Sequence, residues 1–130
     1  MKKLALLVFV IVALSACSTD AVDDSDLVGN WQLVQILADP GDGSGSFRSV
    51  ESEKIIEFRA DGTVTTNTSL CEPNSPEIIS SGSYDIDNHI IFTDCENPTV
   101  QQIDFEFQGR FLVLHFISNE GYSQRYQKLN

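Results

Sequence analysis

The sequence predicts an all-β protein whose fold class is an eight-stranded antiparallel up-and-down barrel. Apolar runs after Leu27 are short and rich in β-branched and aromatic residues, turn residues separate them, and no stretch shows a sustained helical period. The runs number eight and are joined by local connections. Closing such a sheet removes the exposed edges that an open sheet would have to protect, so we expect the first and last strands to pair.

The strands are expected at residues 31–38, 54–59, 63–68, 78–86, 89–93, 99–107, 110–117 and 122–128. The sixth run has the clearest pattern, because apolar and polar residues alternate along it and only one of its faces should be exposed to solvent. The seventh run is apolar on both faces, so its outer face should be covered by the tether or a long loop, or should meet a partner or the membrane. The same alternation predicts an interior lining of Ile56, Phe58, Ile103, Phe105 and Phe107.

The connections alternate between tight and long. Asp61-Gly62, Asp87-Asn88 and Gln108-Gly109 are typical of tight hairpin turns. The other connections, 39–53, 69–77, 94–98 and 118–121, are longer or rich in glycine, serine and proline. Alternate connections of an antiparallel meander lie at opposite ends, so one end of the barrel should carry all of the long loops.

The N-terminal residues predict a leader and an anchor. Lys2 and Lys3 precede an apolar stretch, 4–14, that is too short for a helix to span about 30 Å of bilayer. The run Leu14-Ser15-Ala16-Cys17 that ends it resembles a bacterial lipobox. The resemblance implies removal of residues 1–16 as a lipoprotein signal peptide and attachment of diacylglycerol and a fatty acid such as palmitate to Cys17.

The small, acidic residues after Cys17 indicate a flexible tether over 17–26, followed by a single domain over 27–130. Ser18 follows the acylated cysteine, as in signals that direct lipoproteins to the outer membrane. The acidic residues Asp23, Asp24 and Asp26 are similar to surface-export signals of some bacteria, but a solvated spacer is the simpler interpretation. We therefore expect a lipid-anchored outer-membrane protein, on either the periplasmic face or the cell surface.

Acylation of Cys17 would leave one pair of cysteines, Cys71 and Cys95, in an exported chain. Both fall in long connections at the same expected end, so we predict a disulfide. Closing a loop of about 25 residues would stabilise the fold by about 3.5 kcal/mol on the chain-entropy model. A metal or redox pair is disfavoured, because the spacing is not Cys-x-x-Cys and no histidine lies nearby in sequence.

The charge of the chain excludes nucleic acid as a partner. The formal net charge of −11 becomes −13 when Lys2 and Lys3 leave with the signal, and such a field repels phosphate backbones and anionic lipid surfaces. Solubility of a domain held beside a membrane is the simpler reason for this charge. A cationic partner is the alternative.

Two short motifs resemble those of lipocalin-like domains. Residues 27–33, Leu-Val-Gly-Asn-Trp-Gln-Leu, are similar to the Gly-x-Trp motif of the first strand, and 122–126, Tyr-Ser-Gln-Arg-Tyr, to the last strand with its arginine. The resemblance implies a closed end built by Gly29, Trp31 and Arg125, with the arginine packed across the indole ring. The chain has no counterpart of the family's Thr-Asp-Tyr-like turn after the sixth strand, so ligand binding does not follow from the resemblance.

No motif indicates catalysis, a metal or a cofactor. His89 and His115 lack a third ligand at metal spacing, and no serine lies in a Gly-x-Ser-x-Gly motif. We therefore expect no enzymatic activity. We expect the domain to bind a small apolar or amphipathic ligand at the looped end of the barrel. The alternative is a protein-interaction module of the envelope, such as an inhibitor, stress or surface-assembly component. An open apolar interior would favour the first role and an interior filled by side chains the second.

Overall fold

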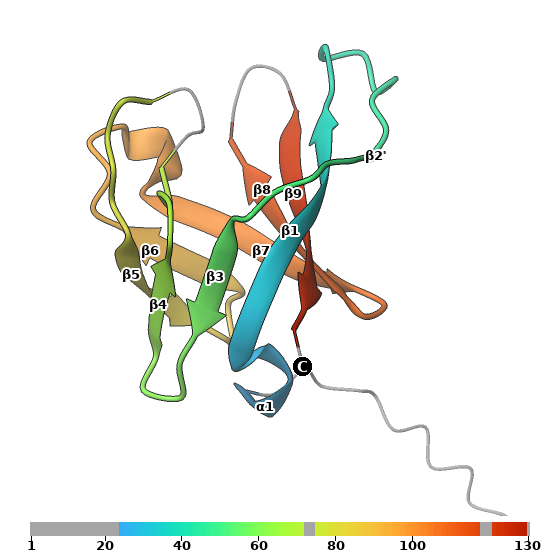
Figure 1. Ribbon diagram of the computed structural model, residues 1–130. Helices are drawn as coiled ribbons and strands as arrows, with labels where there is room; N and C mark the ends of the chain where they lie inside the picture. The colour runs from blue at the N-terminus through green and yellow to red at the C-terminus, as the bar shows by residue number, and fades with distance from the viewer. Residues whose placement is uncertain (1–23, 72–74, 118–120, 130) are drawn as a thin grey trace, which may run out of the picture.

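The computed structural model describes residues 24–71, 75–117 and 121–129, and the expected signal peptide, Cys17 and residues 18–23 of the expected tether lie outside this part of the chain. The described residues form one closed antiparallel sheet (Figure 1). Its elements are α1 (Asp24–Leu27), β1 (Gly29–Ala38), β2 (Arg48–Ser49), β3 (Ile55–Phe58), β4 (Thr63–Thr66), β5 (Ser81–Asp85), β6 (Ile90–Thr93), a 3₁₀ turn η1 (Pro98–Val100), β7 (Gln102–Gln108), β8 (Phe111–Phe116) and β9 (Tyr122–Lys128).

The strand order confirms the eight-stranded barrel. The strands from β3 to β9 follow one another in chain order, and β1 pairs with β3 on one side and with β9 on the other, which closes the sheet. The two-residue strand β2 is an addition that the sequence did not predict. It pairs with the second half of β1, beyond the end of β3.

A β-bulge in β1 changes which residues face the interior. The register with β9 shifts between Leu33 and Gln35, so Val34 is the extra residue. Side chains alternate along a strand, and one extra residue exchanges the two faces beyond it. Trp31 and Leu33 therefore face inward before the bulge, whereas Ile36 faces inward after it and Gln35 faces outward.

The three tight connections lie at one end of the barrel, as predicted. Gly62 and Gly109 have φ of 86° and 60°, a left-handed conformation that glycine adopts without a steric penalty. The β5–β6 turn is different, because its left-handed residue is His89, with φ of 56°. Asp85 holds this turn with a carboxylate oxygen that accepts hydrogen bonds from the backbone N–H groups of Asp87 and Asn88.

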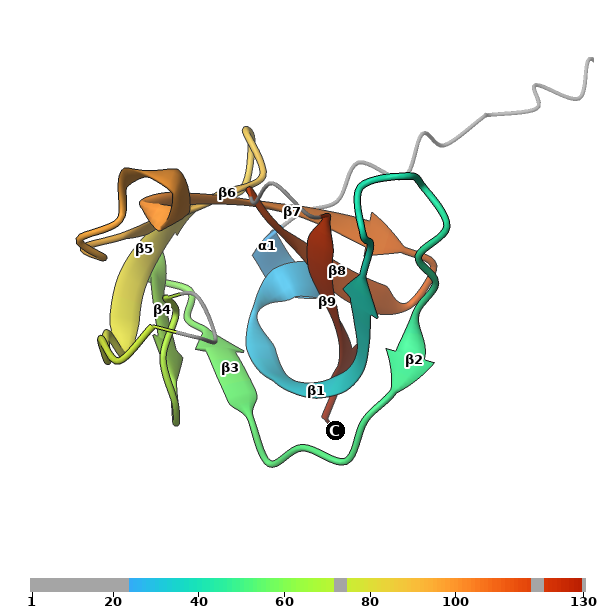
Figure 2. The same cartoon turned by 90° about the horizontal axis from the view of Figure 1, so that it is seen from above.

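The two ends of the barrel differ. Helix α1, the tight turns and the end of β9 lie at the end that we call the closed end (Figure 1). The long loops gather at the opposite end, which faces the viewer in Figure 2. We call these four loops the rim and define it by their described residues, 39–47, 67–71, 75–80, 94–101, 117 and 121.

The observed elements depart from the expected ones in further places. The fourth run was expected to begin at Ile78, but β5 begins at Ser81 and residues 78–80 belong to the preceding rim loop. The sixth run was expected to begin at Thr99, but residues 98–100 form η1 because the side chain of Asn97 caps the Thr99 N–H and Pro98 occupies the first position of the turn. The last three tether residues, 24–26, belong to α1 rather than to an extended spacer. Neither helix of the described chain has the length and apolar composition needed to cross a bilayer.

Asp39 organises the first rim loop. One carboxylate oxygen accepts hydrogen bonds from the backbone N–H groups of Gly41 and Gly43, and the other from that of Gly45. These donors hold the pKa of Asp39 below its ordinary value. The backbone N–H of Asp39 also donates to the carbonyl of Gly121, which ties the first rim loop to the last. The glycine-rich sequence thus forms a defined turn.

Candidate functional site

The closed end is sealed by Trp31 and Leu27. The indole N–H of Trp31 donates to the Leu27 carbonyl at 2.8 Å, and both side chains are buried. Phe107 packs edge-on against the indole, with 6.0 Å between ring centroids. Gly29 has φ of 139°, and a Cβ atom there would lie 2.9 Å from the Lys128 side chain. Both its conformation and its neighbour therefore favour glycine.

The expected pairing of Trp31 with Arg125 is wrong. The cation over the indole is the ammonium of Lys128, 5.6 Å from the ring centroid, and it also donates to the Asp26 carbonyl. Trp31 and Lys128 are direct partners in the β1–β9 ladder. Residues an odd number of positions apart on a strand face opposite sides, so Arg125 points outward where Tyr126 and Lys128 point inward.

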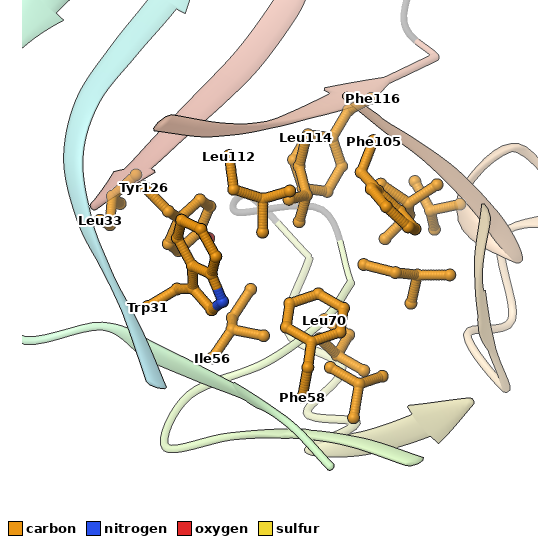
Figure 3. Close-up of a cluster of buried hydrophobic side chains, with 14 of the residues drawn as sticks. Trp31, Leu33, Ile56, Phe58, Leu70, Phe105, Leu112, Leu114, Phe116 and Tyr126 are labelled. Atoms are coloured by element: carbon orange, nitrogen blue, oxygen red, sulfur yellow. The ribbon is translucent and has the colours of Figure 1, made fainter. Parts of the chain in front are cut away.

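The chain's own side chains pack the interior. Four of the five expected lining residues, Ile56, Phe58, Ile103 and Phe105, are at most 2% exposed, and Phe107 is partly buried against the core. The Phe58 ring meets that of Phe105 at a centroid distance of 6.1 Å. Figure 3 shows side chains from β1, β3, β7, β8 and β9 meeting in the middle of the barrel. One core cluster therefore runs from the indole at the closed end toward the rim.

A rim loop covers the looped end of the interior. Leu70, which precedes the first cysteine, is 1% exposed and lies beside Phe58 in the core (Figure 3). Cys71 and Cys95 form the predicted disulfide, with Cα atoms 5.8 Å apart, and both are buried. Ser69 stabilises the loop, because its hydroxyl oxygen accepts hydrogen bonds from backbone N–H groups on both sides of the loop and donates to a carbonyl within it.

A polar layer lies between the core and this loop. The Lys54 ammonium donates to the Ser69 carbonyl at 3.0 Å and lies 3.5 Å from the side-chain oxygen of Gln124. The same oxygen accepts the hydroxyl of Tyr126 at 2.6 Å, and the Gln124 amide donates to the hydroxyl of Tyr122. Within the described part of the chain, no carboxylate pairs with Lys54. Burial lowers the pKa of Lys54 from 10.5 to about 8 and raises that of Tyr126.

The lowered pKa of Lys54 predicts a rise of stability with pH. Between pH 8 and pH 10 the unfolded chain keeps the lysine proton that the folded protein has released, so the free energy of unfolding increases. We expect an increase of the order of 1–2 kcal/mol, because solvent at the rim screens part of the effect. Lys54→Met should abolish the increase, measured by urea unfolding at pH 7, 8, 9 and 10. An equal increase in this variant would assign the titration to another group.

Arg125 forms a second cluster on the outside of the barrel. Its guanidinium lies 3.7 Å from the ring centroid of Phe47, a residue of the first rim loop, and 5.5 Å from that of Phe111. Two of its nitrogens donate to the side-chain oxygens of Gln35 and Gln108 at 2.7 and 2.6 Å. The cluster covers the outer face of β8, where Val113, the ladder partner of Arg125, is completely buried. A long loop thus accounts for the apolar outer face of this strand.

Three side chains on the same outer face form a chain of hydrogen bonds that sequence reasoning missed. The Ser123 hydroxyl lies 2.8 Å from Nδ1 of His115, and Nε2 of this ring lies 3.0 Å from the Glu106 carboxylate. Hydrogen bonds from Gln108 and His115 hold the pKa of Glu106 below its ordinary value. Ser123 is 7% exposed and lies within a strand paired on both sides, where ladder bonds occupy the backbone N–H groups that would stabilise an oxyanion. We interpret these contacts as joining β7, β8 and β9.

The sulfur atoms of the disulfide are not available to a metal. Cys71, Cys95 and Glu77 offer ligand atoms that lie within 4.8 Å of one another. A disulfide sulfur carries no thiolate charge, so this group lacks the ligands that a zinc site needs. The carboxylate of Glu77 instead accepts the backbone N–H of Glu96, and this hydrogen bond is a second link between the two loops.

Hollows on the molecular surface lie outside the barrel wall. One lies between β1 and residues 50–53, a second on the outer face of β4, β5 and β6, and a third over β1, β3 and β4. All three are open to solvent, and their linings mix polar and apolar residues. They are therefore distinct from the interior in which a ligand was expected.

Comparison with known families agrees with this architecture. The family model of a lipocalin-like domain matches residues 27–130. The chain belongs to the family of lipocalin-like domains. No curated protein and no solved structure matches it. The lipocalin-like barrel is a fold of the ligand-binding type, and the family is generally non-enzymatic.

Proposed function

We propose that this lipocalin-like domain is a lipid-anchored interaction module of the bacterial outer membrane. The observation that carries this proposal is the packed interior, because a barrel filled by its own side chains and covered by Leu70 leaves the surface as the functional part. The contact surface is the rim, where the long loops meet and the disulfide braces two of them. The compartment in which the partner is found would show whether the domain lies on the periplasmic face or on the cell surface.

The rim has the charge and the apolar groups of a contact surface. The described residues of its four loops include five aspartates and glutamates and no lysine or arginine. Ile78 and Ile117, in two of these loops, are 76% and 60% exposed. Aliphatic side chains surrounded by like charge favour a partner with a basic surface and an apolar patch.

Photo-crosslinking tests this role. Benzophenone side chains at Ile78 and Ile117, with Leu129 at the closed end as the matched control, should give the same protein adduct from both rim positions and none from the control. The yield should fall as salt increases, because salt screens the attraction between opposite charges. Equal adducts from Leu129, or no adduct from either rim position, would contradict a rim interface.

The anchor gives a separate prediction. Cys17→Ser removes the thiol that carries the lipid, so the variant should move from the membrane to the soluble fraction of cells. Fractionation and immunoblotting measure this change, and the mass of the N-terminal peptide reports the acyl chains of the unaltered protein. Unchanged membrane fractionation of Cys17→Ser would show that another feature holds the protein at the membrane.

Lys54 supports a second candidate function, the binding of a small amphipathic anion beneath the rim. Lys54 has no carboxylate partner in the described chain, and Gln124 links it to the hydroxyls of two tyrosines. Such a cation is a suitable contact for a carboxylate head group. Native mass spectrometry of protein purified from its own membrane decides between the candidates. A bound molecule that is lost in Lys54→Met would favour this function, and ligand-free protein with a co-purified partner would favour the first.

A further inference from the structure

The structure fixes the place where the N-terminal segment leaves the barrel. Helix α1 lies at the closed end (Figure 1), and Leu27, its last residue, is completely buried there. The Trp31 indole and the Lys128 ammonium donate to the carbonyls of Leu27 and Asp26, respectively. The segment that joins Cys17 to the domain therefore begins at the closed end, opposite the rim.

The segment is short compared with the barrel. Asp24 lies seven positions after Cys17, a length of chain that would span about 25 Å if fully extended and about 15 Å as a flexible coil. The ten residues of β1 extend over about 33 Å, and a strand tilt near 40° gives a barrel about 25 Å tall. A rim resting on the bilayer would require an almost fully extended segment along the whole side of the barrel.

Charge opposes the same arrangement. The rim loops contain acidic residues and no lysine or arginine, so they are repelled by anionic head groups. The closed end also carries acids, among them Asp26, Asp61 and Asp85, but it adds the cations Arg59, Arg110 and Lys128, which the rim lacks. Tether length is therefore the main argument for the orientation, and the difference in charge is secondary.

We propose that the closed end faces the bilayer and that the rim is held on the far side of the barrel, directed away from the anchoring membrane. This orientation rests on the proposed acylation of Cys17. It specifies the partner of the rim further: a protein with a basic surface that approaches through the aqueous space, and not a lipid or protein embedded in the same bilayer.

Crosslinking to lipid tests the orientation. The full-length acylated protein is reconstituted into vesicles of phosphatidylethanolamine and phosphatidylglycerol, with benzophenone at Ala60 or Leu129 at the closed end, or at Ile78 or Ile117 on the rim. Ala60 and the two isoleucines are exposed, and Leu129 is 40% exposed, so the four variants should fold. Vesicles that float on a density gradient are irradiated, and lipid adducts are identified by mass spectrometry. We expect lipid adducts from the two closed-end positions and none from the two rim positions.

The outcomes separate the orientation from the anchor. The orientation would be overturned if floating protein gave lipid adducts from Ile78 or Ile117 as readily as from Ala60. It would also be overturned if floating protein gave adducts from none of the four positions. Either result would leave the anchor in place. Protein that carries no acyl chain and does not float would overturn both. Floating protein with adducts confined to Ala60 and Leu129 would establish that the rim points away from the membrane.

Discussion

Trp31→Ala should lower the free energy of unfolding by about 3–5 kcal/mol, the range for large aromatic side chains removed from a core. Trp31 is 2% exposed and forms the floor of the barrel, where it contacts the Phe107 ring and the Lys128 ammonium. The substitution also removes the donor to the Leu27 carbonyl, which leaves that acceptor buried without its partner. Small domains have a total stability of about 5–15 kcal/mol, so a large share would be lost.

The matched control is Trp31→Phe, which keeps a ring at the floor and removes only the N–H donor and part of the volume. Its expected loss is about 1–2 kcal/mol. Urea unfolding followed by circular dichroism measures both variants. A loss below about 1 kcal/mol for Trp31→Ala would show that α1 and the closed end do not depend on the indole.

The barrel was predictable because its signals are local. Alternation in 102–107 and the Asp-Gly and Gln-Gly turns indicate strand, face and hairpin within a few residues of sequence. Strand β2 gives no such signal, because a two-residue strand is too short to show alternation. The helix α1 was missed for a similar reason: four residues show no period, and only the burial of Leu27 explains why the chain turns there.

The position of Arg125 depended on a feature that the sequence does not reveal. The bulge at Val34 directs Gln35 outward, where its amide oxygen accepts a hydrogen bond from the guanidinium. Phe47 reaches the other side of the same cation from a loop whose path is set by Asp39. A motif read along β9 alone therefore identified a structurally important arginine and assigned it to the wrong face. Alternation from Tyr126, which is buried, would have indicated Lys128 as the inward cation.

The candidate site was predictable in its location and less so in its chemistry. Loop lengths and the cysteine positions indicated which end would be elaborated, and the structure places both cysteines there. Sequence alternation identified inward residues but gave no measure of how completely they fill the barrel. The insertion of Leu70 and the contact between Lys54 and Gln124 join residues far apart in the chain, and such contacts follow from the closed fold.

Cys71→Ala should lower the free energy of unfolding by about 3.5 kcal/mol under oxidising conditions, because the unfolded chain then loses the constraint of a cross-link that encloses about 25 residues. The two cysteines are 24 positions apart, and both sulfur-bearing side chains are buried. The variant lacks the packing of the Cys71 side chain in both oxidising and reducing buffer. In reducing buffer the unaltered protein also lacks the cross-link, so any remaining difference in stability comes from packing alone. The difference between the two conditions therefore isolates the contribution of the bridge.

A double variant, Cys71→Ala with Cys95→Ala, is the control against intermolecular pairing of the remaining thiol. Its free energy of unfolding should equal that of the single variant in oxidising buffer and should be close to that of the unaltered protein in reducing buffer. Urea unfolding measures it in both buffers. The Glu77 carboxylate still accepts the Glu96 N–H in these variants, so the two rim loops keep one link and the barrel should stay folded. Equal losses in both buffers would mean that the cysteines stabilise the rim by packing, and the contact surface would then not depend on an oxidising compartment.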